Sequence, residues 1–407
     1  MALFGTGRRR RQLLSIAGAV TLAAAVTACG SSVGSPDATN TTAAPGGPIK
    51  VGLVIPQAGV YAPLGTDMKN GWDLWLDRHQ NKLGNYTVTT VTADEGEGPQ
   101  TGVPAVQKLL QSDQVDVLVG IVNSSTALGV KDMVNEAKKV LVVSNAGAAD
   151  ITGKARSPYI WRTSFTNAQV AAAVGKYLAT TGKTAYAIAP DYAAGAEAIT
   201  GFSSAFTAGG GKVVSNAKPA FGKTDDYQPF ISQIQASSAQ ATYCFFAGAE
   251  AVSFVKQYAQ FGLASQAPLF CSGFLTEGGV LAAQGDAAVG VTTALHYSTE
   301  LDNPANKEFK AAYEAKFGKP PTVYAVQTWD AANVLDRALR TATGLQGDAL
   351  SAALGSITSI DDSPRGPWSF DGQSPKQNFY LRKVEKRGST YVNAVVQSLG
   401  TSSQPSS

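Results

Sequence analysis

Short apolar runs and stretches of helical spacing alternate along most of the chain. In the N-terminal half, strands are predicted over 49–55, 86–91, 115–119 and 140–143, and helices over 64–80, 103–110 and 127–139. The run at 140–143 reads VLVV and is apolar throughout, as expected of a strand that is buried on both faces. Such strands, separated by amphipathic helices, predict a parallel sheet covered by helices on both sides.

The same alternation starts again near residue 185. Strands are predicted over 185–189, 213–214, 242–246 and 269–272, and helices over 194–208, 227–235 and 249–260. Two such halves in roughly 350 residues predict an α/β fold with two doubly wound parallel-sheet lobes. In open parallel sheets, ligands bind beyond the carboxyl ends of the strands. The stretch GIVNSSTALG, residues 120–129, follows a predicted strand and carries hydroxyl groups but no charge, so it is a candidate binding turn.

The two ends of the chain differ in composition from the rest. Arginines 8–11 precede an apolar run over 13–28, which predicts a secretory signal peptide over 1–28 that is too short to be a good membrane span. Residues 29–48 are rich in Ser, Thr, Ala, Pro and Gly and are expected to form a flexible tether. The tail over 400–407 is similar and is expected to be disordered.

The sequence around Cys29, VTACG, resembles the lipobox of bacterial lipoproteins. The resemblance implies cleavage before Cys29 and attachment of lipid to it, which would hold the protein at the outer face of the cytoplasmic membrane. A plain signal peptide with a chance cysteine is the alternative. The pair Arg10 and Arg11 fits either a twin-arginine export signal or the generic basic region of a signal peptide.

Charge and composition exclude several classes of function. The formal charge is +3, but the signal holds four arginines and no acid, so its removal leaves −1 and no argument for a nucleic-acid partner. The two histidines, His79 and His296, lack metal-ligand spacing, and no complete phosphate-binding or dinucleotide motif is present. The sequence shows neither an activated nucleophile nor an acid–base pair, so we predict no enzyme, cofactor or metal. Cys244 and Cys271 lie on predicted strands and form either a disulfide or two buried thiols.

The segment IKVGLVIPQAGVYAPLGTDMKNGWDLWLD, residues 49–77, resembles the opening of the leucine/isoleucine/valine-binding branch of type I periplasmic binding proteins. Further matches are GIVNSSTA, VLVVSNAGAADIT, DYAAG, LDNPANKEFKAAYEAKFGKPP and SPRGPWSFD. The resemblance implies a monomeric extracytoplasmic solute receptor that serves the membrane permease of an ABC importer. A sensory ectodomain of the same fold, acting through a separate membrane partner, is the alternative.

The resemblance also implies how the chain is divided. Three hinge crossings are expected near 162–166, 296–299 and 363–366, and the ligand is expected between the lobes. The lobes would comprise 49–163 plus 298–363 and 164–297 plus 364–399.

The resemblance places a carboxylate ligand at the turn that contains Ser124 and Ser125. There it would accept hydrogen bonds from hydroxyl and backbone N–H groups, aided by about half a positive charge at a helix N-terminus. An ordinary helix cap is the alternative interpretation. The turn formed by Asn145, Ala146 and Gly147 should add a backbone carbonyl or amide.

The chain departs from the amino-acid binders of this branch at two positions. Phe274 stands where they carry an acid that pairs with the ligand ammonium, and Ala148 stands where a Thr is usual. A buried ammonium without an anion is costly, so an aromatic or apolar carboxylate is favoured over a branched-chain amino acid. Glu250 or Glu277 could supply the anion if the alignment register differs.

Aromatic residues near the predicted strand ends are candidates to contact the ligand ring. Tyr61 and Tyr192 are expected to stack on it, with Tyr297 and Tyr324 as weaker candidates. Interdomain or core packing is the alternative role for these side chains.

Overall fold

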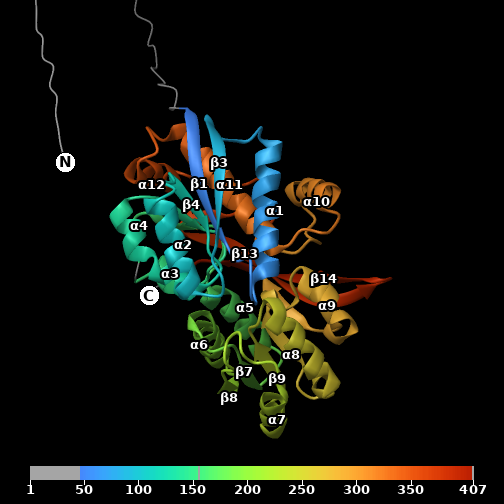
Figure 1. Cartoon of the computed structure of the whole chain (residues 1–407). Helices are drawn as coiled ribbons and strands as arrows, with labels where there is room; N and C mark the ends of the chain where they lie inside the picture. The colour runs from blue at the N-terminus through green and yellow to red at the C-terminus, as the bar shows by residue number, and fades with distance from the viewer. Residues whose placement is uncertain (1–45, 155, 406–407) are drawn as a thin grey trace, which may run out of the picture. The chain divides into compact units, whose positions relative to one another are not determined.

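The computed structural model describes residues 46–154 and 156–405 (Figure 1). The predicted signal, Cys29 and most of the predicted tether lie outside these ranges. Within them, two sheets carry helices on their faces, and we define the first and second lobes by these sheets.

The sheet of the first lobe has six strands in the order β2-β3-β1-β4-β5-β6 within the described ranges. These are β1 (Gly47–Ile55), β2 (Lys82–Leu83), β3 (Tyr86–Asp94), β4 (Val117–Gly120), β5 (Val140–Val143) and β6 (Ile160–Arg162). All neighbours are parallel except β2 and β3. β4 and β5 are buried along their whole length, as their valine-rich sequences predict.

Seven α-helices belong to the first lobe in the described part of the chain. They are α1 (Ala62–Arg78), α2 (Pro99–Gln111), α3 (Ser124–Gly129), α4 (Lys131–Ala137), α10 (Pro304–Phe317), α11 (Val323–Thr341) and α12 (Gly347–Gly355). In Figure 1, β1 and β4 lie between α1 on one side and α2 to α4 on the other. The predicted helix over 127–139 is instead two helices, which meet at Gly129 and Val130; glycine is a poor helix former.

Helix α1 buries one face because its large apolar residues recur every three or four positions. Leu64, Met68, Trp72 and Trp75 are all buried. The helix also lies close to α11: a β-carbon at Gly71 would be 2.1 Å from the carbonyl oxygen of Ala325. This packing holds α1, which begins directly after Tyr61, against α11.

The sheet of the second lobe runs β12-β13-β11-β10-β9-β7-β8, with β14 paired to β13. Its strands are β7 (Thr184–Ile188), β8 (Lys212–Ala217), β9 (Ala241–Cys244), β10 (Leu269–Ser272), β11 (Thr292–Leu295), β12 (Ser369–Asp371), β13 (Ser374–Arg387) and β14 (Thr390–Ser402). The α-helices are α5 (Asn167–Ala179), α6 (Ala193–Ala208), α7 (Gln228–Ala236), α8 (Gly248–Gln260) and α9 (Gly279–Gln284). The strands from β7 to β11 are parallel, and β12, β13 and β14 add antiparallel pairs. The predicted α/β fold with two doubly wound lobes is confirmed.

The C-terminal tail is more ordered than its composition indicates. β14 continues to Ser402, paired with β13, and the Gln404 side chain accepts a hydrogen bond from Thr152 (2.6 Å) and donates one to the Ala149 carbonyl (3.0 Å). The structure therefore differs from the expected disorder at residues 400–402, which belong to β14, whereas residues 403–405 have no regular secondary structure. The polar composition indicated disorder. Pairing with β13, however, gives the backbone N–H and C=O groups of residues 400–402 hydrogen-bond partners, and this requires no large apolar surface. At the other end, β1 begins at Gly47, inside the predicted tether.

Cys244 and Cys271 form a disulfide. They occupy directly paired positions on the neighbouring strands β9 and β10, with Cα atoms 4.6 Å apart. This decides between the two alternatives that the sequence left open. The bond joins the two strands just before the segments that carry Phe245 and Phe274.

The chain passes between the two sheets after β6, after β11 and after α12. Buried polar contacts tie these passages together. Arg365 lies 3.0 Å from Asp330 of α11 and donates a hydrogen bond to Gln377 of β13, which in turn donates to the Ser164 carbonyl. Burial raises the pKa of Asp330 to about 6, although the nearby Arg365 opposes this shift. The lobe boundaries given above remain predictions. No helix in the described ranges is long and apolar enough to span a membrane.

Candidate functional site

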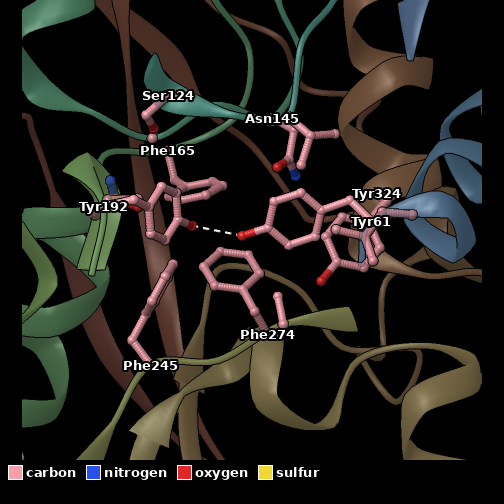
Figure 2. Close-up of a pocket in the computed structure, with 14 residues that line it drawn as sticks. Tyr61, Ser124, Asn145, Phe165, Tyr192, Phe245, Phe274 and Tyr324 are labelled. Atoms are coloured by element: carbon pink, nitrogen blue, oxygen red, sulfur yellow. Dashed lines mark hydrogen bonds between the residues drawn. The ribbon is translucent and has the colours of Figure 1, made fainter. Parts of the chain in front are cut away.

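A small pocket lies where the two lobes face each other (Figure 2). Its walls come from segments at the carboxyl ends of strands and at the starts of helices, as expected for open parallel sheets. The first lobe contributes Tyr61, Leu64, Val122, Ser124, Asn145, Gly147 and Tyr324. The segments leading into the second lobe and its strand ends contribute Phe165, Asn167, Tyr192, Ala194, Phe245, Ala247 and Phe274.

Aromatic rings form most of the apolar wall of this pocket. The ring of Phe274 lies 4.5 Å from that of Phe165, 6.1 Å from that of Phe245 and 6.3 Å from that of Tyr324, measured between centroids. These distances are typical of favourable aromatic contacts. Phe274 therefore holds the centre of an aromatic cluster, where amino-acid binders of the related branch would carry an acid.

Tyr61 and Tyr192 connect the two lobes through their hydroxyl groups. Their oxygens are 2.7 Å apart, so one hydroxyl donates a hydrogen bond to the other. Tyr61 precedes α1 and Tyr192 precedes α6. Burial raises the pKa of both phenols, so both stay protonated at neutral pH. Phe221 stacks on Tyr192 with centroids 4.6 Å apart, which limits the ring surface that Tyr192 offers to a ligand.

Ser124 presents its hydroxyl to the pocket from the first turn of α3. Its Oγ accepts a hydrogen bond from the Ala148 amide at 3.1 Å, and the hydroxyl proton remains able to donate to a ligand. The same amide connects the binding turn to the position where related binders usually carry a Thr. The bond therefore fixes Ser124 against the turn that follows β5.

The neighbouring amide groups are already occupied by internal partners. Asn123 caps α3, and its side-chain oxygen accepts from the amides of Ser125 (2.9 Å) and Thr126 (3.2 Å). The amides of Val122 and Asn123 each donate to the buried carboxyl of Glu95 at 2.7 Å. The turn thus already holds a carboxyl group of the chain itself on its inner side.

Burial governs the protonation of Glu95. It raises the pKa of this carboxyl to about 8, although the two amide hydrogen bonds favour the ionised form. The group is therefore mostly protonated at pH 7 and adds little negative charge beneath Ser124.

Asn145 and Gly147 line the pocket from the turn after β5. The Asn145 side chain donates to Gln327 at 2.8 Å, and the Gly147 carbonyl accepts from the Asn167 amide at 2.7 Å. A β-carbon at Gly147 would lie 2.4 Å from both the Asn167 side-chain oxygen and the Phe165 ring. A larger residue at this position would therefore force the Asn167 and Phe165 side chains to move.

Two of the eight predicted ligand-binding residues do not line the pocket. Ser125 is not among the lining residues, and its amide donates a hydrogen bond to the Asn123 side chain. Ala146 is buried beside the pocket, where its amide donates to the Ile121 carbonyl (2.9 Å) and its carbonyl accepts from Arg162 (2.9 Å). The Ser125 amide and both backbone groups of Ala146 thus have internal partners, and a ligand contact by either residue remains a prediction. The other six, Tyr61, Ser124, Asn145, Gly147, Tyr192 and Phe274, come together in the pocket.

The two acids considered as partners of a ligand ammonium lie outside the pocket. Glu277 forms a buried ion pair with Arg382 (2.9 Å) and accepts from the Val323 amide (2.8 Å), so both of its oxygens have partners. Glu250 accepts from the Gly222 amide at 2.8 Å, and burial raises its pKa to about 7. Within the described ranges, no Asp, Glu, Lys or Arg lines the pocket.

Sequence reasoning missed several residues of the pocket. Phe245 follows β9 directly, and Asn167 begins α5, so their position after a strand or at a helix start was the only available signal. Phe165 belongs to the predicted first crossing and was not considered as a ligand contact. Tyr324, a weaker candidate, does line the pocket, whereas the Tyr297 hydroxyl donates to Asn306 in the core and does not.

Comparison with known sequences identifies the family. The profile of a family described as periplasmic binding protein matches residues 48–389. The chain belongs to the periplasmic binding protein family. It is 32% identical over 367 residues to the Leu/Ile/Val-binding protein homolog 6 of Brucella melitensis, with 88% of this chain and 93% of that protein covered. The resemblance to the leucine/isoleucine/valine-binding branch is thus confirmed.

Two solved structures that are slightly more similar to the chain than the Brucella relative contain bound aromatic acids. A solute-binding protein of an ABC transporter from R. palustris, in complex with benzoate, is 36% identical with a TM-score of 0.82, covering 87% of this chain and 97% of that chain. Another, from Rhodopseudomonas palustris BisB5 in complex with 3,4-dihydroxybenzoic acid, is 33% identical with a TM-score of 0.83, covering 88% and 98%. The family consists of solute-binding proteins, not enzymes. The chain is therefore an extracytoplasmic substrate-binding protein of an ABC transporter.

Proposed function

We propose that this chain binds a small aromatic carboxylate between its lobes and delivers it to the permease of an ABC importer. Cys29 would carry the lipid that holds the protein at the outer face of the cytoplasmic membrane. The ligand carboxylate would lie at Ser124 and its ring among Phe165, Phe245 and Phe274.

The lack of charged side chains around the pocket carries the proposal. No Asp, Glu, Lys or Arg lines it in the described part of the chain. A free amino acid would bury its ammonium beside Phe274, where a cation–π contact of about 0.5–2 kcal/mol is the best replacement for an ion pair. Burial of an unpaired charge costs several kcal/mol, so the aromatic contact does not offset it. An aromatic ring instead gains about 25 cal/mol for each Å² of apolar surface that it buries.

A carboxylate meets a different environment at Ser124. The serine hydroxyl can donate to it, and the Ser124 and Gly147 amides have no hydrogen-bond partner within the described ranges. Hydrogen bonds to a charged acceptor are among the stronger ones in proteins, so an anion can bind without Lys or Arg. The relatives solved with benzoate and with 3,4-dihydroxybenzoic acid support this ligand class.

A branched-chain amino acid is the second candidate. The name of the Brucella relative, a Leu/Ile/Val-binding protein homolog, favours it. Glu250 is the acid to consider, because it acts electrostatically on Tyr61 and Tyr192 of the pocket. Its carboxyl would have to leave the Gly222 amide to reach a ligand ammonium.

Thermal denaturation of the purified protein separates the two ligand classes. Benzoate at 100 times its Kd should stabilise the folded state by about 2.7 kcal/mol and raise Tm, because a ligand that binds only the folded state shifts the equilibrium. Leucine, isoleucine and valine at the same concentration should leave Tm unchanged. Stabilisation by leucine, and by no aromatic acid, would overturn the proposal in favour of the second candidate.

A further inference from the structure

The hydroxyl group of Tyr324 faces no partner in the proposed binding of a carboxylate and its ring. The residue is 1% exposed, stands in the first turn of α11 and lines the pocket. Its hydroxyl has no hydrogen-bond partner among the described residues. Buried hydroxyls in native proteins are nearly always paired, so an unpaired one calls for a physical explanation.

The other hydroxyls of the pocket are already paired. Those of Tyr61 and Tyr192 bond to each other, and Ser124 accepts from Ala148. Burial raises the pKa of the Tyr324 phenol well above its usual value, so this hydroxyl keeps its proton and can both donate and accept. Among the pocket hydroxyls in the described ranges, that of Tyr324 is therefore neutral and free to form a hydrogen bond with a ligand.

Its position relative to the carboxylate site is informative. Figure 2 shows Ser124 and Tyr324 at opposite sides of the pocket, with Phe165 between them in the view. The Tyr324 ring contacts Phe274 at 6.3 Å between centroids, so its hydroxyl lies on the same aromatic wall as the proposed ring site. A ligand with its carboxylate at Ser124 would direct the far edge of its ring toward Tyr324.

We propose that Tyr324 determines specificity by forming a hydrogen bond with a hydroxyl group at the meta or para position of the ligand ring. This inference rests on the proposed function and narrows the ligand class to hydroxylated aromatic carboxylates. A hydroxyl at the ortho position would stay beside the carboxylate and could not reach Tyr324.

Calorimetry on the purified protein with four ligands tests the inference. The ligands are benzoate and its 2-hydroxy, 3-hydroxy and 4-hydroxy derivatives. We expect the 3-hydroxy or the 4-hydroxy acid to bind about 2- to 13-fold more tightly than benzoate, the range for one neutral hydrogen bond, and the 2-hydroxy acid to show no such gain. The three hydroxy acids differ only in the position of the hydroxyl group. Their relative affinities therefore test, on the unmodified protein, whether a meta or para hydroxyl gains a hydrogen bond.

Tyr324→Phe removes the hydroxyl and keeps the ring. In this variant the hydroxy acids should lose their preference over benzoate, so that all four acids bind with similar Kd. Tyr227→Phe is the matched control, because the Tyr227 hydroxyl is also buried without a partner but lies outside the pocket. This control should keep the preference.

Each contrary result overturns the inference in a recognisable way. If the unmodified protein binds benzoate but gains nothing from a meta or para hydroxyl, the inference fails and the proposed function stands. If Tyr324→Phe weakens benzoate as much as its hydroxy derivatives, Tyr324 serves the ring or the carboxylate instead. If none of the four acids binds, the proposed function fails and the inference with it.

Discussion

Replacement of Ser124 by alanine separates a ligand contact from a helix cap. The change removes the hydroxyl that would donate to the carboxylate and the oxygen that accepts from Ala148 at 3.1 Å. A hydrogen bond to a charged group contributes about 1.5–3 kcal/mol, so the Kd for benzoate should rise roughly tenfold to 150-fold. The amide of Ala148, which is buried, would lose its acceptor, which should lower the free energy of unfolding by about 1–3 kcal/mol.

Ser125→Ala provides the matched control one residue further along α3. Ser125 lies outside the pocket, and only its amide, not its hydroxyl, takes part in the cap formed by Asn123. Calorimetry should show an almost unchanged Kd for this variant, and urea denaturation should show an almost unchanged stability. If Ser124→Ala loses stability and yet binds benzoate as tightly as the unmodified protein, Ser124 serves only the fold. If both variants lose affinity equally, the carboxylate lies elsewhere on the turn.

Three further changes test other parts of the structure. Gly147→Ala should abolish benzoate binding in calorimetry, because its β-carbon would lie 2.4 Å from the Phe165 ring; full affinity would show that the lobes need not approach here. Burial raises the pKa of Glu95 to about 8 and that of Glu250 to about 7, so the folded chain keeps protons that the unfolded chain releases near pH 4.5. The free energy of unfolding should therefore fall as pH rises from about 5 to 8, and less steeply in Glu95→Gln; urea titrations that show equal slopes would contradict this. Cys29→Ser should release the protein from membranes or leave its signal uncut, as fractionation and mass measurement can show; normal processing with membrane retention would refute the anchor.

The fold could be read from the sequence because its signals are local. β5 reads VLVV and is buried along its length, and the spacing of Leu64, Met68 and Trp72 fixes the inner face of α1. The break at Gly129 was missed because one glycine weakens a helix without determining whether it ends. The strand structure of residues 400–402 was missed because it depends on pairing with β13, which lies nearby in space but has no local signal.

The pocket was only partly predictable, for a related reason. Strand ends pointed to Ser124, Gly147 and Phe274, because the topology of parallel sheets brings such ends together. Both Ser124 and Ser125 were predicted to bind the ligand, and the sequence does not show that the Ser125 amide is occupied by the Asn123 side chain, because this depends on the Asn123 rotamer. Phe165 lies in a crossing segment, so it enters the pocket only when the two lobes are assembled.

The protonation state of Glu95 affects both the stability of the turn at residues 122–124 and the ability of the pocket to bind an anion. Its carboxyl bonds to the amides of Val122 and Asn123, and Asn123 is the residue before Ser124. An ionised Glu95 would place a negative charge behind the site of the ligand carboxylate, and two like charges at such short range repel strongly in a dry interior. Since its pKa is raised to about 8, the group is mostly neutral at pH 7 and the anion can bind. The proton on Glu95 therefore allows a ligand carboxylate to bind at Ser124 without repulsion from a second negative charge. The affinity for benzoate should decline once pH exceeds the pKa of Glu95, about 8.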